Sequence, residues 1–229
     1  MKKERNFKPQ DSEYWKKRPI DDPKKDWPYG GDWVETYWKS REHPHRSLIL
    51  NAIESLRPIG SILEIGCSCG PNLANIGDRH HGIKLSGIDA NKTAIARGKE
   101  LLPNADLRVG FATKLPFKNE SYDLIVVDAV LIYVPPEDIL QVITEIDRVV
   151  KRAVLLVEWH NEDSILGIVK DFHWCRNYHR IFRRLGFKVE MHRFNKDSWP
   201  SKTWQKHGRL YLCQRAFQIG EKKSSNEQN

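Results

Sequence analysis

The sequence contains no long apolar run and only four cysteines among its 229 residues. No apolar segment approaches the roughly 18 residues that a membrane-spanning helix needs. Four cysteines could not staple a domain of this size, and Cys67 with Cys69 has no second Cys or His pair at the spacing of a zinc site. We therefore expect a cytoplasmic protein that binds no metal and does not enter a membrane.

Basic residues are in excess only in the last part of the chain. The formal net charge is +8, yet residues 1–169 carry 24 Lys and Arg against 25 Asp and Glu, whereas residues 170–229 carry 14 against 5. Such a region could attract nucleic acid, a membrane or a small anionic substrate, or it could be a solvated surface. With 39% hydrophobic residues, the chain has enough apolar material for a folded core.

Hydrophobic patterning predicts alternating strands and helices after residue 58. Strands are predicted at 61–65, 83–89, 107–109, 122–128, 153–159, 187–194 and 209–217, and helices from residues 44 and 71 and at 93–102, 136–150 and 171–185. The alternation predicts a mostly parallel sheet, because parallel neighbours need a crossover connection. The last two strands have no helix between them, so the final strand is expected to run antiparallel. We expect an N-terminal arm with a helix at 1–58, an α/β domain at 59–219 and a disordered tail at 220–229.

A glycine-containing turn follows the first predicted strand. Gly66 and Gly70 flank three small residues, and Pro71 then starts a helix. The turn lacks the Gly-x-Gly-x-x-Gly spacing of a dinucleotide site, since Ser68 and Pro71 occupy two of the three glycine positions. It does match the Gly-x-Ser-x-Gly elbow of α/β hydrolases, in which Ser68 would be the nucleophile. That elbow normally follows several strands and an oxyanion segment, and neither precedes Gly66.

Several segments, taken in order, resemble the class I S-adenosylmethionine-dependent methyltransferases, with a domain like methyltransferase type 11. Glu64 and the glycine turn resemble the first motif of that family, and Asp89 matches the second-strand acid that holds the ribose. Residues 110–117, 121–127 and 148–151 continue the resemblance. The sequence departs from the family at Phe111, where an acid often holds the adenine amino group, and at 152–153, where a glycine pair is usual. The resemblance implies a Rossmann-like sheet of seven strands with helices on both faces.

The resemblance also implies S-adenosylmethionine as the cofactor, bound at the carboxyl ends of the parallel strands. The expected cofactor-binding residues are Glu64, Gly66, Cys67, Ser68, Gly70, Asn72, Asp89, Ala90, Asn91, Phe111, Ala112, Thr113, Asp128, Ala129, Val130 and Tyr133. In this arrangement 64–70 lie under the methionine and ribose, 111–113 near the adenine, and 128–130 near the methionine and sulfonium. Methyl transfer then chiefly requires alignment of the acceptor with the carbon–sulfur bond and exclusion of water.

The methyl acceptor is expected among the parts of the chain outside these motifs. The N-terminal arm, 158–161 and the tryptophan-rich loop at 199–204 would surround a small-molecule acceptor. His160 or His173 could take a proton from a hydroxyl or ammonium group. Tyr37, Trp38 and Tyr133 are aromatic candidates beside the sulfonium. The residues 43–45, His-Pro-His, are interpreted as a loop and helix cap.

Other functions remain open from the sequence, namely nucleic-acid methylation and cofactor binding without catalysis. Residues 134–137 only partly resemble the Pro-Pro signature of enzymes that methylate amino groups of nucleic acids, because the flanking amide or acid and the aromatic are missing. Helical spacing predicts one solvated stripe, formed by Arg176, Arg180, Arg183 and Arg184. Four further cations flank the loop expected near the substrate and indicate an acceptor that carries negative charge: Lys196, Lys202, Lys206 and Arg209.

Overall fold

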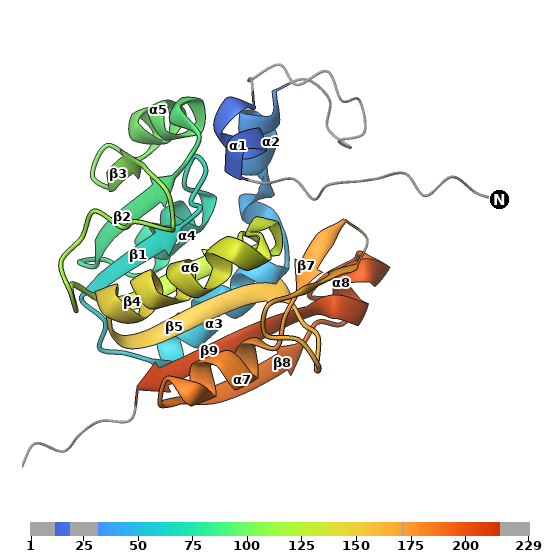
Figure 1. Cartoon of the computed structure of the whole chain (residues 1–229). Coiled ribbons are helices and arrows are strands. Elements are labelled where there is room, and N and C mark those ends of the chain that lie inside the picture. Colours follow the sequence, from blue (N-terminus) through green and yellow to red (C-terminus); the bar gives the residue numbers. More distant parts are fainter. Residues whose placement is uncertain (1–11, 19–31, 171, 216–229) are drawn as a thin grey trace, which may run out of the picture.

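The computed structural model describes residues 12–18, 32–170 and 172–215, and within them one large sheet lies between two layers of helices (Figure 1). The tail expected at 220–229, and most of the irregular arm expected before residue 32, lie outside the described residues.

The sheet has seven strands in the order β3, β2, β1, β4, β5, β9, β8. Their bounds are Ser61–Ile65 (β1), Lys84–Asp89 (β2), Asp106–Val109 (β3), Tyr122–Asp128 (β4), Val150–Trp159 (β5), Phe187–Arg193 (β8) and Gly208–Arg215 (β9). All neighbours pair in parallel except at β9, which is antiparallel to both β5 and β8. The expected mostly parallel sheet with an antiparallel last strand is thus confirmed. The strand order changes direction between β1 and β4, and ligands of such sheets bind at this switch point.

Helices cover both faces of the sheet. One face carries α3 (His45–Ser55), α4 (Pro71–Arg79) and α5 (Lys92–Leu101), and the other carries α6 (Pro136–Val149) and α7 (Tyr178–Arg184). Along β4 the side chains alternate, so that Val126 belongs to the same core cluster as Ile53 of α3, while Ile125 belongs to the cluster that contains Ile146 of α6. Both faces of β4 are therefore buried, which explains why its sequence is an unbroken apolar run.

The helix predicted at 171–185 is wrong in its first half. A two-stranded hairpin, β6 (Ile168–Lys170) with β7 (His173–Cys175), precedes α7. Phe172 adopts a positive φ of 68° in the hairpin turn, a backbone conformation that a helix does not allow.

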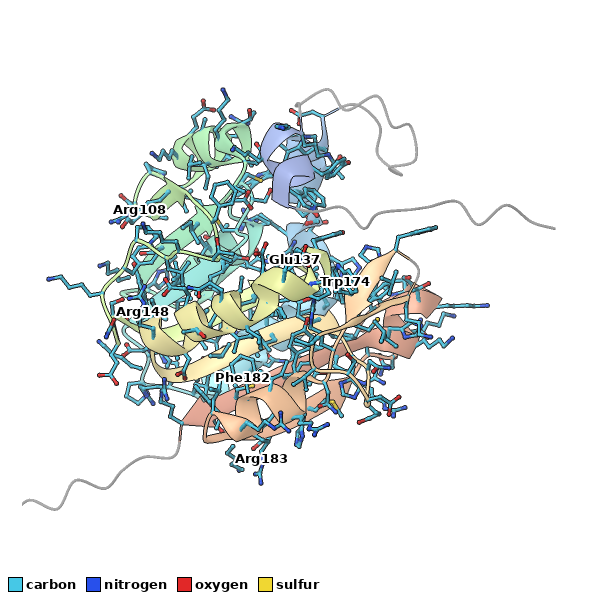
Figure 2. All side chains as sticks on the ribbon, viewed as in Figure 1. Arg108, Glu137, Arg148, Trp174, Phe182 and Arg183 are labelled. Carbon is cyan, nitrogen blue, oxygen red and sulfur yellow. The ribbon has the colours of Figure 1, made fainter. Side chains whose placement is uncertain are left out.

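The predicted arginine stripe is wrong at one member. Arg176 is fully buried, because it lies between β7 and α7 rather than on a helix face. Arg183 projects from α7 into solvent, and Phe182 on the same helix points toward the sheet (Figure 2). The predicted loop at 199–204 also differs, since α8 (Lys202–His207) begins within it.

Three short helices precede α3 in the described N-terminal residues. They are α1 (Ser12–Lys17), α2 (Trp33–Lys39) and the 3-10 helix η1 (Ser40–Glu42). Asp32 caps α2, as its carboxylate accepts the backbone N–H of Val34 at 2.8 Å. Within the described residues, every helix is too short or too polar to cross a membrane.

Candidate functional site

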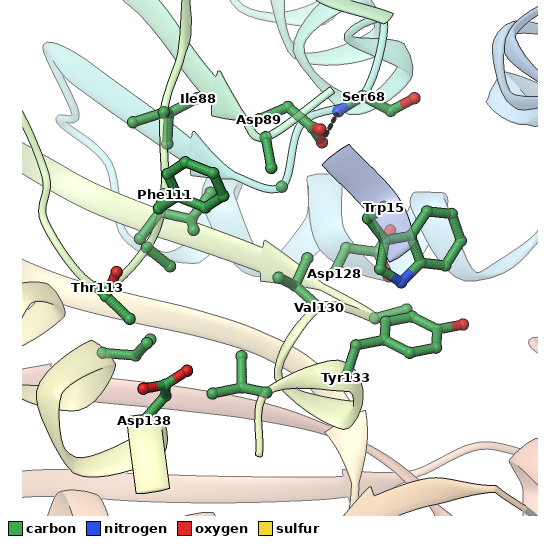
Figure 3. Close-up of a pocket in the computed structure, with 18 of the residues that line it drawn as sticks. Trp15, Ser68, Ile88, Asp89, Phe111, Thr113, Asp128, Val130, Tyr133 and Asp138 are labelled. Atoms are coloured by element: carbon green, nitrogen blue, oxygen red, sulfur yellow. Dashed lines mark hydrogen bonds between the residues drawn. The ribbon is translucent and has the colours of Figure 1, made fainter. Parts of the chain in front are cut away.

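A cavity of about 300 Å³ opens at the ends of β1, β2 and β4 (Figure 3). Eleven of the sixteen residues expected from the sequence line it: Gly66, Ser68, Asp89, Ala90, Phe111, Ala112, Thr113, Asp128, Ala129, Val130 and Tyr133. They come from four separate segments of the chain, which the parallel sheet brings to one edge. The sequence motifs therefore converge on one concave site.

The glycine turn forms the floor of the cavity between β1 and α4. Gly66 has a φ of +72°, and a Cβ atom placed on it would lie 2.2 Å from Cγ2 of Val130. Only glycine fits there, since both the backbone conformation and the close approach exclude a side chain. The backbone N–H of Gly66 donates to the carbonyl oxygen of Ile88 at 2.7 Å, which ties the turn to the end of β2.

Asp89 at the end of β2 faces the cavity across this turn (Figure 3). Its Oδ2 accepts the backbone N–H of Ser68 at 2.9 Å, and its Oδ1 accepts that of Asn91 at 2.8 Å. Burial raises the pKa of this carboxyl group, while the two N–H donors act in the opposite direction. Each oxygen keeps a lone pair for a ligand donor.

Asp128 at the end of β4 lines the opposite part of the cavity. Its Oδ2 accepts hydrogen bonds from His45 Nε2 at 2.9 Å and from Asn72 Nδ2 at 3.0 Å, and Arg46 Nη1 lies 3.4 Å away. Burial alone would raise the pKa of Asp128, but His45, Arg46 and Asn72 together hold it well below its usual range. His45 is thus more than the helix-cap residue expected from the sequence, because it starts α3 with its side chain buried against this carboxylate.

Two buried polar side chains, outside the cavity, hydrogen-bond to the turn after β4. Glu158 of β5 accepts the backbone N–H groups of Val130, Leu131 and Ile132 at 2.8 to 3.0 Å. Arg176 Nη1 donates to the carbonyl oxygen of Leu131 at 2.7 Å. Both side chains are 0% exposed. They fix the short helix η2 (Leu131–Tyr133), which brings Tyr133 to the cavity wall.

The N-terminal helices contribute an aromatic wall. Trp15, Trp33 and Tyr37 line the cavity, and the ring of Trp15 lies 4.9 Å from that of Tyr133. Burial raises the pKa of Tyr37 to about 12, so its hydroxyl stays protonated at neutral pH. Tyr37 and Tyr133 were expected from the sequence, whereas Trp38 packs under Arg41 instead and does not line the cavity.

Five expected residues lie behind the cavity wall rather than on it, and they are Glu64, Cys67, Gly70, Asn72 and Asn91. Asn72 donates to Glu64 Oε1 at 2.8 Å and so joins the first motif to Asp128. Burial raises the pKa of Glu64 to about 8, and its Oε2 has no hydrogen-bond partner among the described residues.

Asn91 has a different position from the one expected. Its Oδ1 caps α5, and its Nδ2 donates to the carbonyl oxygens of Trp15 at 2.8 Å and Arg18 at 3.0 Å. Asn91 therefore anchors α1, the helix that carries Trp15 to the cavity.

The two candidate proton acceptors occupy different places. His173 lies beside the cavity wall, with its Nε2 3.4 Å from the hydroxyl of Tyr133. His160 is buried away from the cavity, and its Nδ1 lies 2.5 Å from the hydroxyl of Tyr211. The geometry thus separates two residues that the sequence could not rank.

The hydrolase interpretation of Ser68 does not agree with the structure. Ser68 lies in the turn with a φ of 50°, and no His side chain in the described ranges hydrogen-bonds its hydroxyl. A serine hydrolase needs such a base to activate the nucleophile. Across residues 12–18, 32–170 and 172–215, no three His, Cys, Asp or Glu side chains are grouped as a metal site requires.

Several residues of the site were not among the cofactor-binding residues expected from the sequence. Trp15, His45 and Arg46 reach it from the N-terminal segment, and Glu158 and Arg176 support it from behind. A charged residue inside an apolar strand, such as Glu158, was the one available indication, because burial of a carboxylate requires donors nearby.

Residues 62–153 match a family model described as a methyltransferase domain. Demethylmenaquinone methyltransferase of Alkalihalophilus pseudofirmus is 26% identical over 151 residues, which are 63% of this chain and 62% of that protein. The chain spans less than two thirds of the length of the curated relatives that it matches.

Solved structures share the fold at low identity. A Haloferax volcanii methyltransferase, in complex with the Trm112 methyltransferase activator, has a TM-score of 0.60 at 17% identity, over 81% of this chain and 95% of that one. Magnesium protoporphyrin IX methyltransferase of Synechocystis PCC 6803 with bound SAH also has a TM-score of 0.60, at 13% identity over 81% and 88%. Residues 62–153 are thus similar to methyltransferase domains, and the solved structures share the order and direction of the strands in a Rossmann-like fold.

Proposed function

We propose that this protein is an S-adenosylmethionine-dependent methyltransferase that acts on an oxygen, nitrogen or carbon atom of a small-molecule acceptor. The observation that carries the proposal is the meeting of the left-handed turn at Gly66 with the carboxylates of Asp89 and Asp128 in one cavity at the switch point of the sheet. When bound there, S-adenosylmethionine supplies a methyl group that its sulfonium has already activated.

The residues of the cavity fit this cofactor from end to end. Asp89 offers both carboxylate oxygens to the ribose hydroxyls, in the geometry set by its two backbone donors. Phe111, Ala112 and Thr113 provide an apolar surface for the adenine. At the other end, Oδ1 of Asp128 accepts no hydrogen bond from the described residues and suits the cofactor's ammonium group. These two carboxylates would therefore orient the cofactor along the cavity.

The aromatic wall would keep water away from the reacting end. The rings of Trp15, Trp33, Tyr37 and Tyr133 line the same cavity as Asp128, and they contact one another in two edge-to-face pairs. Rings of this kind stabilise a cation such as a sulfonium by about 0.5 to 2 kcal/mol. The chain's contribution to the reaction is then orientation and exclusion of water, which are the main requirements of an in-line displacement.

An acceptor hydroxyl or ammonium must lose its proton, and His173 is the better placed of the two candidate residues. It adjoins Tyr133 on the cavity wall, whereas His160 is turned toward Tyr211. Lys196, Lys202 and Lys206 are exposed around the tryptophan-rich segment and support an acceptor with negative charge. Arg209 does not serve this role, because it is buried and its Nη1 donates to backbone carbonyl oxygens of its own turn.

An acceptor screen that measures S-adenosylhomocysteine release tests the proposal. Separate pools would hold amines, hydroxylated aromatics, sugars, lipids and RNA, each with S-adenosylmethionine in excess. Release with a small-molecule pool, and a KM that rises with salt for an anionic acceptor, would support it. Release of S-adenosylhomocysteine with RNA alone would show that the acceptor is a nucleic acid and not a small molecule.

A further inference from the structure

We propose that His45 and Arg46 are positioning residues for the methionine end of the cofactor, and that they act by fixing the Asp128 carboxylate. The inference rests on the proposed function. It makes the N-terminal segment part of the cofactor site, whereas the sequence suggested only a cap over the acceptor.

Three side chains surround one oxygen of the Asp128 carboxylate. Its Oδ2 accepts from Asn72 and His45 and faces Arg46, so one oxygen is saturated by three donors. The side chains of His45, Arg46 and Asp128 are 6%, 7% and 9% exposed. No donor in the described part of the chain reaches Oδ1, and Asp128 lines the cavity. One carboxylate oxygen is thus used for anchoring, and the other is left for a ligand.

His45 and Asp128 differ in protonation state, since His45 is neutral and Asp128 is ionised. Burial lowers the pKa of His45, so its ring is neutral at neutral pH. A neutral ring that donates through Nε2–H to an ionised carboxylate must accept through Nδ1. His43 Nδ1 lies 2.5 Å from that atom, and the same nitrogen lies 3.4 Å from the backbone N–H of His45. A neutral His45 therefore donates to Asp128, and Asp128 stays anionic because its pKa lies well below its usual range.

Arg46 and Trp199 hold the residues around Asp128 in place. Arg46 Nε donates to the carbonyl oxygen of Ser40 at 2.8 Å, and Nη1 donates to Asn72 Oδ1 at 2.5 Å. The ring of Trp199 lies on that of His45, with centroids 4.2 Å apart. Because its support is held from several sides, the Asp128 carboxylate is presented in one orientation. A fixed anion with one open oxygen is the complement of an alkylammonium group.

The test compares two ligands that differ only at the methionine end. S-adenosylhomocysteine carries the ammonium and carboxylate groups, and 5′-methylthioadenosine has the same adenosine and thioether without them. Calorimetry on the full chain should show that His45→Phe weakens S-adenosylhomocysteine binding about tenfold or more and leaves 5′-methylthioadenosine within about twofold. His45→Gln, which keeps an N–H donor near the Nε2 position, should restore most of the affinity. Asp128→Asn should show the same selective loss.

His80→Phe is the matched control, because His80 is likewise buried and paired with a carboxylate, that of Glu54, but lies outside the cavity. It should leave both affinities unchanged. Should His45→Phe not fold, His45→Asn, which is polar but too short to reach Asp128, takes its place. Equal losses for both ligands, or an unchanged affinity for S-adenosylhomocysteine, would overturn the proposal. If the unaltered protein binds neither ligand, the proposed function itself fails, and that result is distinct from a variant that binds as well as the unaltered chain.

Discussion

Glu158 and Arg176 hold opposite ends of the same turn. The Glu158 carboxylate accepts the backbone N–H groups at the start of η2, and the Arg176 guanidinium donates to the carbonyl oxygens of Leu131 and Val134 toward its end. Burial raises the pKa of Glu158 to about 8, while its three N–H donors act in the opposite direction. Carboxyl oxygens that accept at the N–H end and a guanidinium that donates at the carbonyl end both complement the polarity of the turn. Two distant parts of the chain thereby determine where Tyr133 lies.

Replacing either side chain should destabilise the fold. We expect Glu158→Gln and Arg176→Met each to lower the free energy of unfolding by about 1 to 3 kcal/mol. Gln has one acceptor oxygen where Glu158 uses two, and Met leaves two carbonyl oxygens without their guanidinium donor. Urea denaturation monitored by tryptophan fluorescence measures this change. Glu190→Gln, in an exposed pair with Lys188, should change it by less than about 0.5 kcal/mol. Equal effects in all three variants would contradict this role for the buried pair.

Gly66→Ala should damage the site more than a glycine replacement elsewhere. Gly82 has a similar φ of +82°, but a Cβ atom there meets nothing within 4 Å. Gly82→Ala should therefore cost only the left-handed backbone penalty of about 1 to 2 kcal/mol. Gly66→Ala adds the contact with Val130, and we expect a larger loss of stability together with loss of cofactor binding.

The double variant Gly66→Ala/Val130→Ala separates these two contributions. Removing the Cγ atoms of Val130 relieves the close contact and leaves the backbone penalty. Thermal unfolding of the single and double variants measures the recovery. No recovery at all would mean that the contact with Val130 is not what requires glycine.

Asp89→Ala should weaken binding of S-adenosylmethionine at least tenfold, since each lost ribose hydrogen bond to a charged acceptor contributes about 1.5 to 3 kcal/mol. Isothermal titration calorimetry measures the dissociation constant directly. Asp106→Ala provides the control, because Asp106 lies outside the cavity and pairs with Arg108 on its own strand. If the Asp89→Ala variant bound S-adenosylmethionine as tightly as the unaltered protein, Asp89 would not be the residue that binds the ribose.

Glu64 should make the protein less stable as the pH rises. Its pKa is raised by burial from 4.5 to about 8 in the folded chain, so the folded state binds the proton more tightly than the unfolded state. The stability from this group is complete below about pH 4.5 and is lost as the pH rises through about 8. Glu64→Gln imitates the protonated form. Between pH 5 and 9 we expect the unaltered protein to lose on the order of 1 to 3 kcal/mol more than this variant, by denaturant unfolding at each pH.

The sheet and the main motifs could be predicted from the sequence because their causes are local. The bounds of β1 and β4 agree with the prediction, since strands buried on both faces are short apolar runs between turn residues. The glycine turn and Asp89 follow such strands directly. Their convergence at one edge then follows from parallel topology alone.

Contacts between distant segments could not be predicted in this way. His45 and Asp128 are 83 residues apart, and Asn91 and Trp15 are 76 apart. Arg176 illustrates the same limit, because arginine at helical spacing usually lies on a solvated face, whereas here backbone carbonyl oxygens satisfy it in the interior. The periodicity of a segment does not predict hydrogen bonds between polar side chains that only the folded chain brings together.

We propose that the cavity binds S-adenosylmethionine through Asp89 and Asp128. Titration calorimetry of the unaltered chain with S-adenosylmethionine, S-adenosylhomocysteine and NAD tests it most directly. We predict saturable binding of one molecule of either sulfur-containing ligand per chain and no binding of NAD. The absence of heat with both sulfur-containing ligands would contradict the account.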